Sequence, residues 1–407
     1  MRKTISLREV GFIALGIILY MQNWLILQGN AWGYVDEIVA IVSIMYYLSY
    51  KIQKSDKAIF FLMVVTLISG LIFNVLFGIQ KHTIAIIEDV ISMYKFLFVY
   101  LGMKTYLGKK RVNILRIIKV LTGILKIYLA IIFMCALLNL FTDVGMSAEI
   151  RYGLRSFAFI YGTPGHVINQ MSYSLLVLYA DREYLKKSDK IWIFISLAVM
   201  LSTLKTRAII LVFLYISLYY FFVLRKKKRI GLEIAIVVMA IGLLGISQFE
   251  YYFTREGTPR QMFVAGAIKL VKEYFPFGTG FATYGSSAAA DFYSPLYYSL
   301  GFSNRWGMTE TASQYLNDNY LPMVFGEFGL IIATVFLILI YKYCKVLIKR
   351  STDNQSVNVK LMTYFFVGDI VLSSVQSSYL AHYSVVTLSV FYFLFFNQNK
   401  RMKQGIV

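Results

Sequence analysis

Residues 258–281 read Thr258-Pro-Arg260-Gln-Met-Phe-Val-Ala-Gly-Ala-Ile-Lys-Leu-Val-Lys272-Glu-Tyr-Phe-Pro-Phe-Gly278-Thr-Gly280-Phe. They lie within residues 247–320, the only long segment of the chain that is not a run of apolar residues. Loops longer than about 15 residues without structure of their own are uncommon and usually functional. We therefore expect any chemistry of this protein to face the segment 247–320.

The remainder of the chain is predominantly apolar. Of its 407 residues, 58% are hydrophobic and 15% are charged, whereas a soluble domain carries about 25% charge. Apolar segments long enough to cross about 30 Å of hydrocarbon recur throughout. The first leads directly into further spans and lacks the small-residue site of a cleaved signal peptide, so we expect it to be a span. The sequence predicts an all-α polytopic membrane protein, a single domain 1–407 with about twelve transmembrane helices at 9–28, 33–50, 58–78, 84–103, 120–141, 165–181, 190–204, 207–224, 230–247, 321–341, 359–376 and 380–397.

The positions of Lys and Arg predict the orientation of the spans. The chain has 41 Lys and Arg against 21 Asp and Glu, and most of the basic residues fall in alternate loops. Cytoplasmic loops carry such an excess, so we expect both termini in the cytoplasm and residues 248–320 in a large extracytoplasmic loop. The alternation also argues against nucleic-acid binding as the purpose of the net charge of +20.

Several basic residues lie on the extracytoplasmic side despite this bias. Lys205 and Arg207 occupy a tight turn between two spans. Charged side chains at such a depth cost about 2.5–3.5 kcal/mol each, so the pair suggests an anionic ligand; the alternative is that both side chains reach the outer headgroups. Arg151 and Arg155 belong to the preceding outer loop, where substrate contact and a solvated surface are equal alternatives.

The quoted stretch predicts an amphipathic helix inside the large loop. Thr258 is a good N-cap, Pro259 fits the first helical position and Gln261 completes a capping box. Apolar residues then recur at helical spacing until Pro276, which predicts a helix on the outer membrane surface or over the span bundle. Arg260 sits in its first turn, where an anion would meet both the guanidinium and the positive end of the helix.

Other loop residues are candidates for substrate contact. The aromatic stretch 292–306 is suited to stacking on sugar faces, although aromatic residues also line membrane interfaces. The charged candidates elsewhere in the loop are Arg255, Arg305 and Glu310.

Ionisable residues within the spans admit structural and functional interpretations. Lys95 has the spacing to share a helical face with Glu88 or Asp89, either as an internal ion pair or as a substrate contact. Asp36, near the outer end of its span, is expected to be solvated. A structural role is the preferred interpretation of two further residues, His166 and Asp369.

Four motifs occur in an order that points to a known family. They are Thr203-Leu-Lys205-Thr-Arg207-Ala, then Arg260 followed by Phe275-Pro-Phe-Gly278-Thr-Gly280-Phe, then Asp318-Asn319-Tyr320, and Gly326-Glu327-Phe-Gly329. With the number of spans and the large loop before the last three, they resemble the O-antigen polymerase and ligase superfamily, the Wzy-type polysaccharide polymerases. The resemblance covers chiefly residues 200–335.

This resemblance implies glycan transfer from an undecaprenyl pyrophosphate carrier to an acceptor sugar, on the outer face of the bacterial cytoplasmic membrane, with no metal and no cofactor. The family's pyrophosphate-binding arginines correspond to Arg207 and Arg260. Asp318 stands where ligases typically carry a histidine, which favours a polymerase of surface polysaccharide. Asn319 and Tyr320 complete that motif as candidates for substrate binding.

The residues agree with this chemistry. Arginines would stabilise the charge that develops on the departing pyrophosphate, and a base would take the proton of the acceptor hydroxyl. The candidates for that base are Asp318, Glu310 and His382, and attack opposite the leaving group would invert the anomeric centre. Expected partners are lipid-linked oligosaccharides, the bilayer and, as a further candidate, a chain-length regulator. The alternatives are an O-antigen ligase and a lipid-linked glycan flippase, although transporters usually show paired repeats.

Overall fold

The computed structural model describes residues 6–109, 112–180, 190–227, 231–250, 255, 257–317, 319–354 and 357–403. The structure is 78% helical with almost no strand, which confirms the all-α prediction. Two short strands, β1 (Ser147–Arg151) and β2 (Leu154–Phe157), pair as an antiparallel hairpin. The helices are α1 (Leu7–Gln28), η1 (Asn30–Tyr34), α2 (Val35–Leu48), α3 (Lys57–Phe77), α4 (Thr83–Lys109), α5 (Ile114–Phe141), η2 (Phe159–Tyr161), α6 (Pro164–Ala180), α7 (Lys190–Ser202), α8 (Thr206–Tyr219), the π-helical η5 (Tyr220–Leu224), α9 (Leu232–Phe249), α10 (Pro259–Glu273), α11 (Ser287–Asp291), α12 (Pro295–Ser299), η7 (Phe302–Asn304), α13 (Tyr320–Asn354), α14 (Val357–Gln376), η8 (Tyr379–Ala381) and α15 (Tyr383–Lys403).

Helices occupy all twelve positions predicted as spans, but fewer satisfy the requirements for crossing a membrane. Within the described ranges, six segments are long and apolar enough: Leu7–Gln28, Asn30–Leu48, Lys57–Phe77, Ile114–Phe141, Thr206–Leu224 and Tyr320–Thr352. Two shorter apolar helices are Lys190–Ser202 and Tyr383–Phe396. The fold is therefore that of an α-helical multi-pass membrane protein, and the prediction of twelve crossings is not confirmed.

The difference arises partly from helices that bury polar side chains inside the bundle. α6 is 17 residues long and buries four polar residues, Asn169, Gln170, Ser172 and Ser174. α4 buries Asp89 and Lys95. A helix surrounded by other helices rather than by lipid tolerates such residues when they find partners. Its sequence is consequently less apolar than that of a lipid-facing span.

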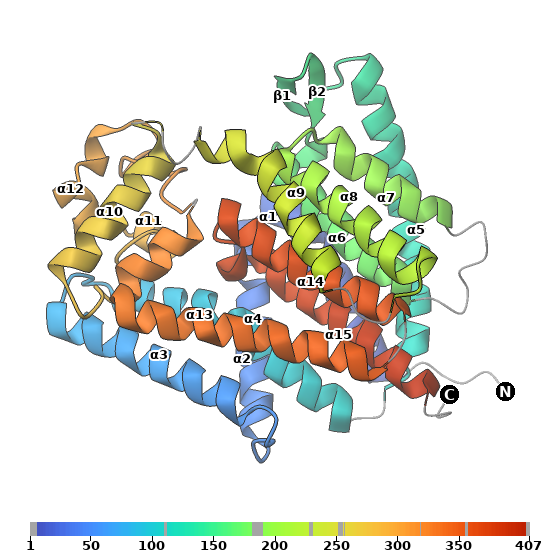
Figure 1. Ribbon diagram of the computed structural model, residues 1–407, viewed down its shortest axis with the longest axis horizontal. Helices are drawn as coiled ribbons and strands as arrows, with labels where there is room; N and C mark the ends of the chain where they lie inside the picture. The colour runs from blue at the N-terminus through green and yellow to red at the C-terminus, as the bar shows by residue number, and fades with distance from the viewer. Residues whose placement is uncertain are drawn as a thin grey trace.

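The large loop forms a unit of its own beside the bundle (Figure 1). Its helices α10, α11 and α12 lie together at one end of the molecule, where α10 contacts α13 and α11 contacts α4. The β1–β2 hairpin lies at a different corner, next to α5. α3 and α13 pack along each other and lead from the bundle to the loop unit.

α10 confirms the predicted amphipathic helix. The Thr258 hydroxyl accepts a hydrogen bond from the Gln261 N–H at 3.4 Å, and the helix ends at Glu273, just before the predicted stop at Pro276. Its apolar residues Phe263, Ala267 and Leu270 are buried in the core of the loop unit. The aromatic residues Tyr284, Tyr297 and Phe302, which follow the helix in sequence, belong to the same core. The helix therefore covers the loop's own core and α13 rather than lying flat on a membrane.

Buried polar side chains of the bundle bind the loop backbone at residues 281–284. Asn74 of α3 donates to the carbonyl of Phe281 and accepts from its N–H, each at 2.8 Å. Asp89 of α4 accepts from the next N–H at 2.6 Å, and Glu327 of α13 accepts from the two that follow, at 3.2 and 3.3 Å. Because buried backbone groups require such partners, three helices together fix the path of the loop.

A break in α13 completes this attachment. Gly329 lies inside the helix with φ of 65° and ψ of −177°. The carbonyls of Gly326 and Glu327 accept hydrogen bonds from two loop N–H groups at 3.2 and 2.9 Å. The loop approaches so closely at Gly278 that an added Cβ would lie 2.2 Å from the Glu327 carbonyl oxygen. The two glycine-containing motifs noted in the sequence therefore bind one another.

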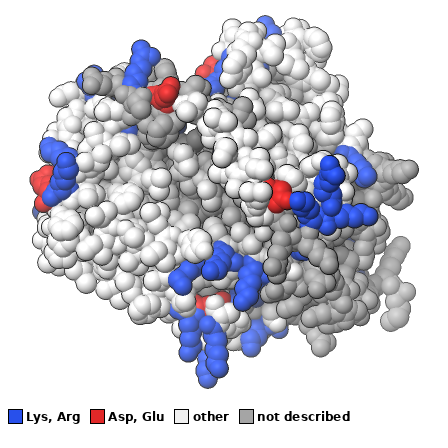
Figure 2. All heavy atoms as spheres, in the orientation of Figure 1, with Lys and Arg blue, Asp and Glu red and all other residues white. Residues whose placement is uncertain are grey.

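Charged side chains are unevenly distributed over the visible face of the molecule. Figure 2 shows Lys and Arg gathered at the lower edge, where the chain between α2 and α3 lies, at the right-hand edge, and around the loop unit. A broad area between these groups carries neither basic nor acidic side chains. This pattern agrees with a membrane-embedded middle and polar ends.

We predict that Gly329→Ala destabilises the protein. The added Cβ would lie 2.0 Å from the Phe277 carbonyl oxygen, in a backbone conformation that costs an L-residue about 1–3 kcal/mol. The measurement is the thermal denaturation midpoint of the purified chain in detergent. Gly123→Ala in α5 is the matched control, since nothing lies within 4 Å of its added Cβ and alanine favours a helix interior. A midpoint for Gly329→Ala equal to that of Gly123→Ala would contradict the tight fit.

Candidate functional site

Arg207 is placed by a sharp change of chain direction between α7 and α8. Leu204 has a φ of 53°, and the extended Lys205 is the N-cap of α8. The first turn of α8 therefore begins immediately after the turn and carries Arg207 into the bundle. The Arg207 side chain is only 10% exposed. This confirms the connection expected from the sequence and shows that the guanidinium points inward rather than to solvent.

Three elements supply the contacts of Arg207. Its Nη2 donates to Asn169 Oδ1 of α6 at 2.7 Å and to Asp369 Oδ1 of α14 at 3.1 Å. Its Cζ lies 4.7 Å from the centre of the Tyr379 ring in η8. A guanidinium stacked on an aromatic face and paired with a carboxylate is held in one orientation.

The hydrogen bonding of this arrangement is incomplete. Asp369 is fully buried, and its Oδ1 also accepts from the Ser373 hydroxyl at 2.7 Å. Asp369 Oδ2 and Arg207 Nε are both buried without a hydrogen-bond partner among the described residues. Buried polar atoms are normally paired by protein or water. The guanidinium therefore retains one N–H group, at Nε, that can donate a hydrogen bond to a ligand oxygen or to a water molecule.

Hydrogen bonds connect Asn169 to His382, whose ring stacks on a second histidine, His166. Asn169 Nδ2 donates to Ser384 Oγ at 2.7 Å, and that hydroxyl is 2.8 Å from His382 Nδ1. His382 and His166 stack with their ring centres 6.1 Å apart. The Tyr383 hydroxyl is 2.9 Å from His166 Nδ1. A cation, an acid, two imidazoles and a phenol thus form one cluster at the ends of α6, α8, α14 and α15.

A buried ion pair lies in the same bundle. Lys95 Nζ is 2.7 Å from Asp36 Oδ2, and both side chains are at most 4% exposed. Gln22 donates to the other carboxylate oxygen of Asp36 at 2.9 Å. Lys95 therefore pairs with Asp36 of α2 rather than with Glu88 or Asp89 of its own helix, and the expectation that Asp36 is solvated is wrong. Two helices packed together bring these residues into contact, which spacing along one helix does not reveal.

Lys205 and Arg151 share a different carboxylate. Glu149 Oε1 is 3.1 Å from Lys205 Nζ and 2.9 Å from Arg151 Nε, and all three side chains are partly exposed. Partial burial alone would raise the pKa of Glu149, but hydrogen bonds from Arg151 and Lys205 lower it overall. The two basic residues predicted as substrate ligands are thus paired with an acid of the β1–β2 hairpin. Such exposed pairs contribute about 0–1 kcal/mol.

Two residues of the third motif are buried at the end of the loop. Asn319 is 2% exposed, and neither atom of its side-chain amide has a hydrogen-bond partner within the described ranges. Tyr320, 1% exposed, begins α13 and directs its hydroxyl toward Met93 Sδ at 3.9 Å. The carbonyl of Asn317 accepts a hydrogen bond from the Ser378 hydroxyl at 2.6 Å. The end of the loop is thereby joined to the residue preceding Tyr379.

The remaining predicted site residues are distributed over the hairpin and the loop. Arg155 lies in β2 and is partly exposed, and Arg260 lies partly exposed in the first turn of α10. Arg255, Arg305 and Glu310 are exposed, and Glu310 accepts a hydrogen bond from Tyr298 at 2.9 Å. Asp318 lies outside the described residues. Among the predicted residues that the structure describes, only Arg207 and His382 belong to the cluster of Arg207, Asn169 and Ser384.

The sequence did not single out Asn169, Tyr379, Tyr383 or Ser384. His166 and Asn169 are three residues apart on α6, and therefore share a helical face. Polar residues on one face of an otherwise apolar helix point to a partner inside the bundle. That spacing was the available signal. Nothing in it, however, predicts that the partner comes from α8 or α15.

The chain matches no family among the protein-family models against which it was scanned, and no curated protein matches it. Across the described ranges, no three His, Cys, Asp or Glu side chains are arranged to hold a metal ion together.

We predict that Lys95→Met destabilises the protein far more than Lys205→Met. Removing one member of a buried pair leaves an uncompensated charge and costs about 3–5 kcal/mol, whereas the exposed pair of Lys205 contributes little. Thermal denaturation in detergent compares the two variants. Adding Asp36→Asn to Lys95→Met should restore part of the loss. Equal midpoints for the two single variants would show that burial of the Lys95 pair does not matter.

Proposed function

We propose that this protein polymerises oligosaccharide repeat units carried on undecaprenyl pyrophosphate into a surface polysaccharide. The observation that supports this most directly is the buried Arg207 guanidinium, which is fixed by Asn169, Asp369 and Tyr379 and keeps an unpartnered Nε. A fixed guanidinium suits the oxygens of a phosphate. The motifs that resemble the O-antigen polymerases and ligases place the same residue at the pyrophosphate.

The proposed topology follows from the distribution of charge. The helical bundle crosses the cytoplasmic membrane of a bacterium several times, both termini are cytoplasmic, and the loop unit lies outside. Supporting this orientation, most Lys and Arg fall in the loops assigned to the cytoplasm. Arg207 and His382 then lie near the outer ends of their helices, at the level where the carrier's pyrophosphate meets water.

The proposed reaction is a direct displacement. The hydroxyl oxygen of the acceptor sugar attacks the anomeric carbon of the donor as the bond from that carbon to the pyrophosphate oxygen breaks. The electron pair of the broken bond stays on the pyrophosphate oxygen, and the pyrophosphate leaves still attached to its lipid carrier. The anomeric configuration inverts. A donor aimed where negative charge grows contributes most in the transition state, and this is the role we assign to Arg207.

The proton of the attacking hydroxyl requires a base. Glu310 is exposed and bonded to Tyr298, whereas His382 belongs to the Arg207 cluster. The Ser384 backbone N–H donates to His382 Nδ1 at 3.3 Å, and the Ser384 hydroxyl is 2.8 Å from the same nitrogen. In neutral His382 the hydrogen is therefore on Nε2, and Nδ1 is the nitrogen that would take up a proton. We therefore favour His382 among the candidate bases. Asp318 keeps its proposed place beside Asn319 in the third motif.

The proposal also assigns partners. The donor and the acceptor are both carrier-linked oligosaccharides, bound in the bilayer, and a chain-length regulator is a candidate partner protein. Arg260 and the aromatic residues of the loop unit are proposed to contact the sugars and the second phosphate. No metal and no cofactor enters the reaction.

Deletion of the gene in its host tests the class of reaction. Surface glycans and carrier-linked glycans are separated by size before and after deletion. A polymerase predicts that single repeat units are displayed in place of long chains. Long chains left on the carrier would instead indicate a ligase, and single units retained on the cytoplasmic side would indicate a flippase. Either of these results would overturn the proposal.

A conservative substitution tests the role of Arg207. Arg207→Lys keeps the charge but removes the guanidinium donors, and we expect chain extension to fall by about 100-fold, the typical effect of removing one such donor. The matched control is Arg225→Lys, because Arg225 also stacks on a tyrosine, Tyr220, at 5.3 Å. The control should retain wild-type chain length. Comparable membrane levels of both variants, with chain length unchanged in each, would remove Arg207 from the reaction.

A further inference from the structure

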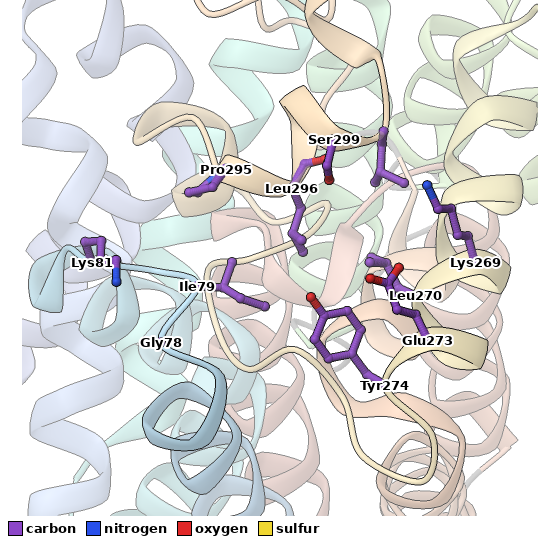
Figure 3. A pocket seen from close by; sticks show the side chains of 11 residues that line it. Gly78, Ile79, Lys81, Lys269, Leu270, Glu273, Tyr274, Pro295, Leu296 and Ser299 are labelled. Carbon is purple, nitrogen blue, oxygen red and sulfur yellow. The ribbon is translucent and has the colours of Figure 1, made fainter.

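A groove of about 410 Å³ opens in the loop unit, apart from the Arg207 cluster. α10 forms one side, the chain between α3 and α4 forms another, and α12 forms the third. Figure 3 shows Lys269, Leu270 and Glu273 projecting from α10 and Tyr274 just beyond its end, with Lys81 on the opposite side. The volume lies within the range of pockets that hold small ligands, about 300–1,000 Å³.

The groove combines an apolar floor with a charged rim. Ile79, Leu270 and Leu296 contribute the floor. Lys81, Lys269 and Glu273 carry the charges and are exposed at the surface. Two ammonium groups against one carboxylate leave a net charge of about +1, so the groove favours a ligand with one net negative charge. The carboxylate and the Ser299 hydroxyl can accept hydrogen bonds from hydroxyl groups of the same ligand.

The groove lies at the end of a helix that faces lipid. α3 is among the helices long and apolar enough to cross a membrane, and it ends at Phe77, one residue before the groove begins at Gly78. The last turns of α3 expose large apolar side chains, Ile72, Val75, Leu76 and Phe77. Phe275 and Phe277, just beyond α10, are 63% and 45% exposed. Exposed aromatic rings at a helix end are typical of the headgroup level of a bilayer.

We propose that this groove binds the headgroup of an anionic phospholipid with one net negative charge and free hydroxyls, of the phosphatidylglycerol type. Lys81 and Lys269 attract the phosphate from opposite sides of the groove, Glu273 and Ser299 accept hydrogen bonds from the glycerol hydroxyls, and the acyl chains lie along the exposed face of α3. The bound lipid attaches the loop unit to the membrane surface. This inference requires only that α3 lies in a bilayer, and it does not rest on the proposed polymerase activity.

The charges of the groove argue against other phosphate-bearing lipids. A phosphatidylethanolamine headgroup has no net charge and would leave one lysine uncompensated. A diphosphate carries more negative charge than the two lysines balance beside Glu273. Lysines near the headgroups attract an anionic lipid, and we expect the two together to give phosphatidylglycerol a binding preference of about 30-fold over a lipid with no net charge.

The experiment titrates the purified full-length chain in detergent with lipid and follows its thermal denaturation midpoint. Phosphatidylglycerol should raise the midpoint saturably, whereas phosphatidylethanolamine and inorganic phosphate at the same concentrations should not. Lys81→Ala/Lys269→Ala should weaken the response to phosphatidylglycerol at least tenfold. The matched control is Lys272→Ala, which removes an exposed lysine of α10 that does not line the groove and should respond as the wild type does.

Each remaining outcome overturns the proposal. An equal response of the double variant and the control would place lipid binding elsewhere. An equal response to inorganic phosphate would indicate a free anion site, and tighter binding of undecaprenyl phosphate than of phosphatidylglycerol would indicate a carrier site. Because the substituted lysines are exposed, the double variant should match the wild type in the absence of lipid, and that midpoint is measured as the reference.

Discussion

The need to satisfy buried backbone groups determines how the outer loop is attached. The loop residues that follow Gly280 are inside the protein, and their N–H and C=O groups find partners in Asn74, Asp89 and Glu327 of three different helices. The break in α13 at Gly329 leaves the carbonyls of Gly326 and Glu327 to accept hydrogen bonds from two further N–H groups of the loop. An unpartnered buried group costs about 1–3 kcal/mol, so the loop has one favourable path. The polar residues that fix it lie in helices that otherwise contact apolar neighbours.

The attached loop is joined to the Arg207 cluster at its other end. Where the loop returns to the bundle, the Asn317 carbonyl accepts a hydrogen bond from the Ser378 hydroxyl. Tyr379, which follows Ser378 in the chain, stacks on Arg207. A displacement of the end of the loop at Asn317 would therefore shift the Tyr379 ring, which orients the guanidinium. In the account proposed here, the loop unit positions the sugars and the bundle supplies the charge, and this hydrogen bond lies between the two.

The sequence was sufficient to locate the helices, because apolar runs persist wherever a helix packs on lipid or on its neighbours. It also identified the helix capped by Thr258 and the tight turn that carries Arg207, since both depend on local spacing, but it left open whether the Arg207 side chain points into the bundle or to the headgroups. It did not show that Asn169 and Asp369, 38 and 162 residues away in sequence, hold that guanidinium. It also overestimated the number of crossings, because a buried polar helix such as α6 has the pattern of neither a lipid-facing span nor a loop. The pairing of Lys95 with Asp36 depends in the same way on tertiary packing.

The most direct test of the account is a structure of the protein with a short-chain polyprenyl diphosphate bound in a lipid nanodisc. The account predicts that a diphosphate oxygen lies about 2.7–3.2 Å from Arg207 Nε, with the guanidinium still stacked on Tyr379. A diphosphate bound elsewhere, with Arg207 contacting only Asn169 and Asp369, would contradict the assignment of this cluster as the site of the reaction.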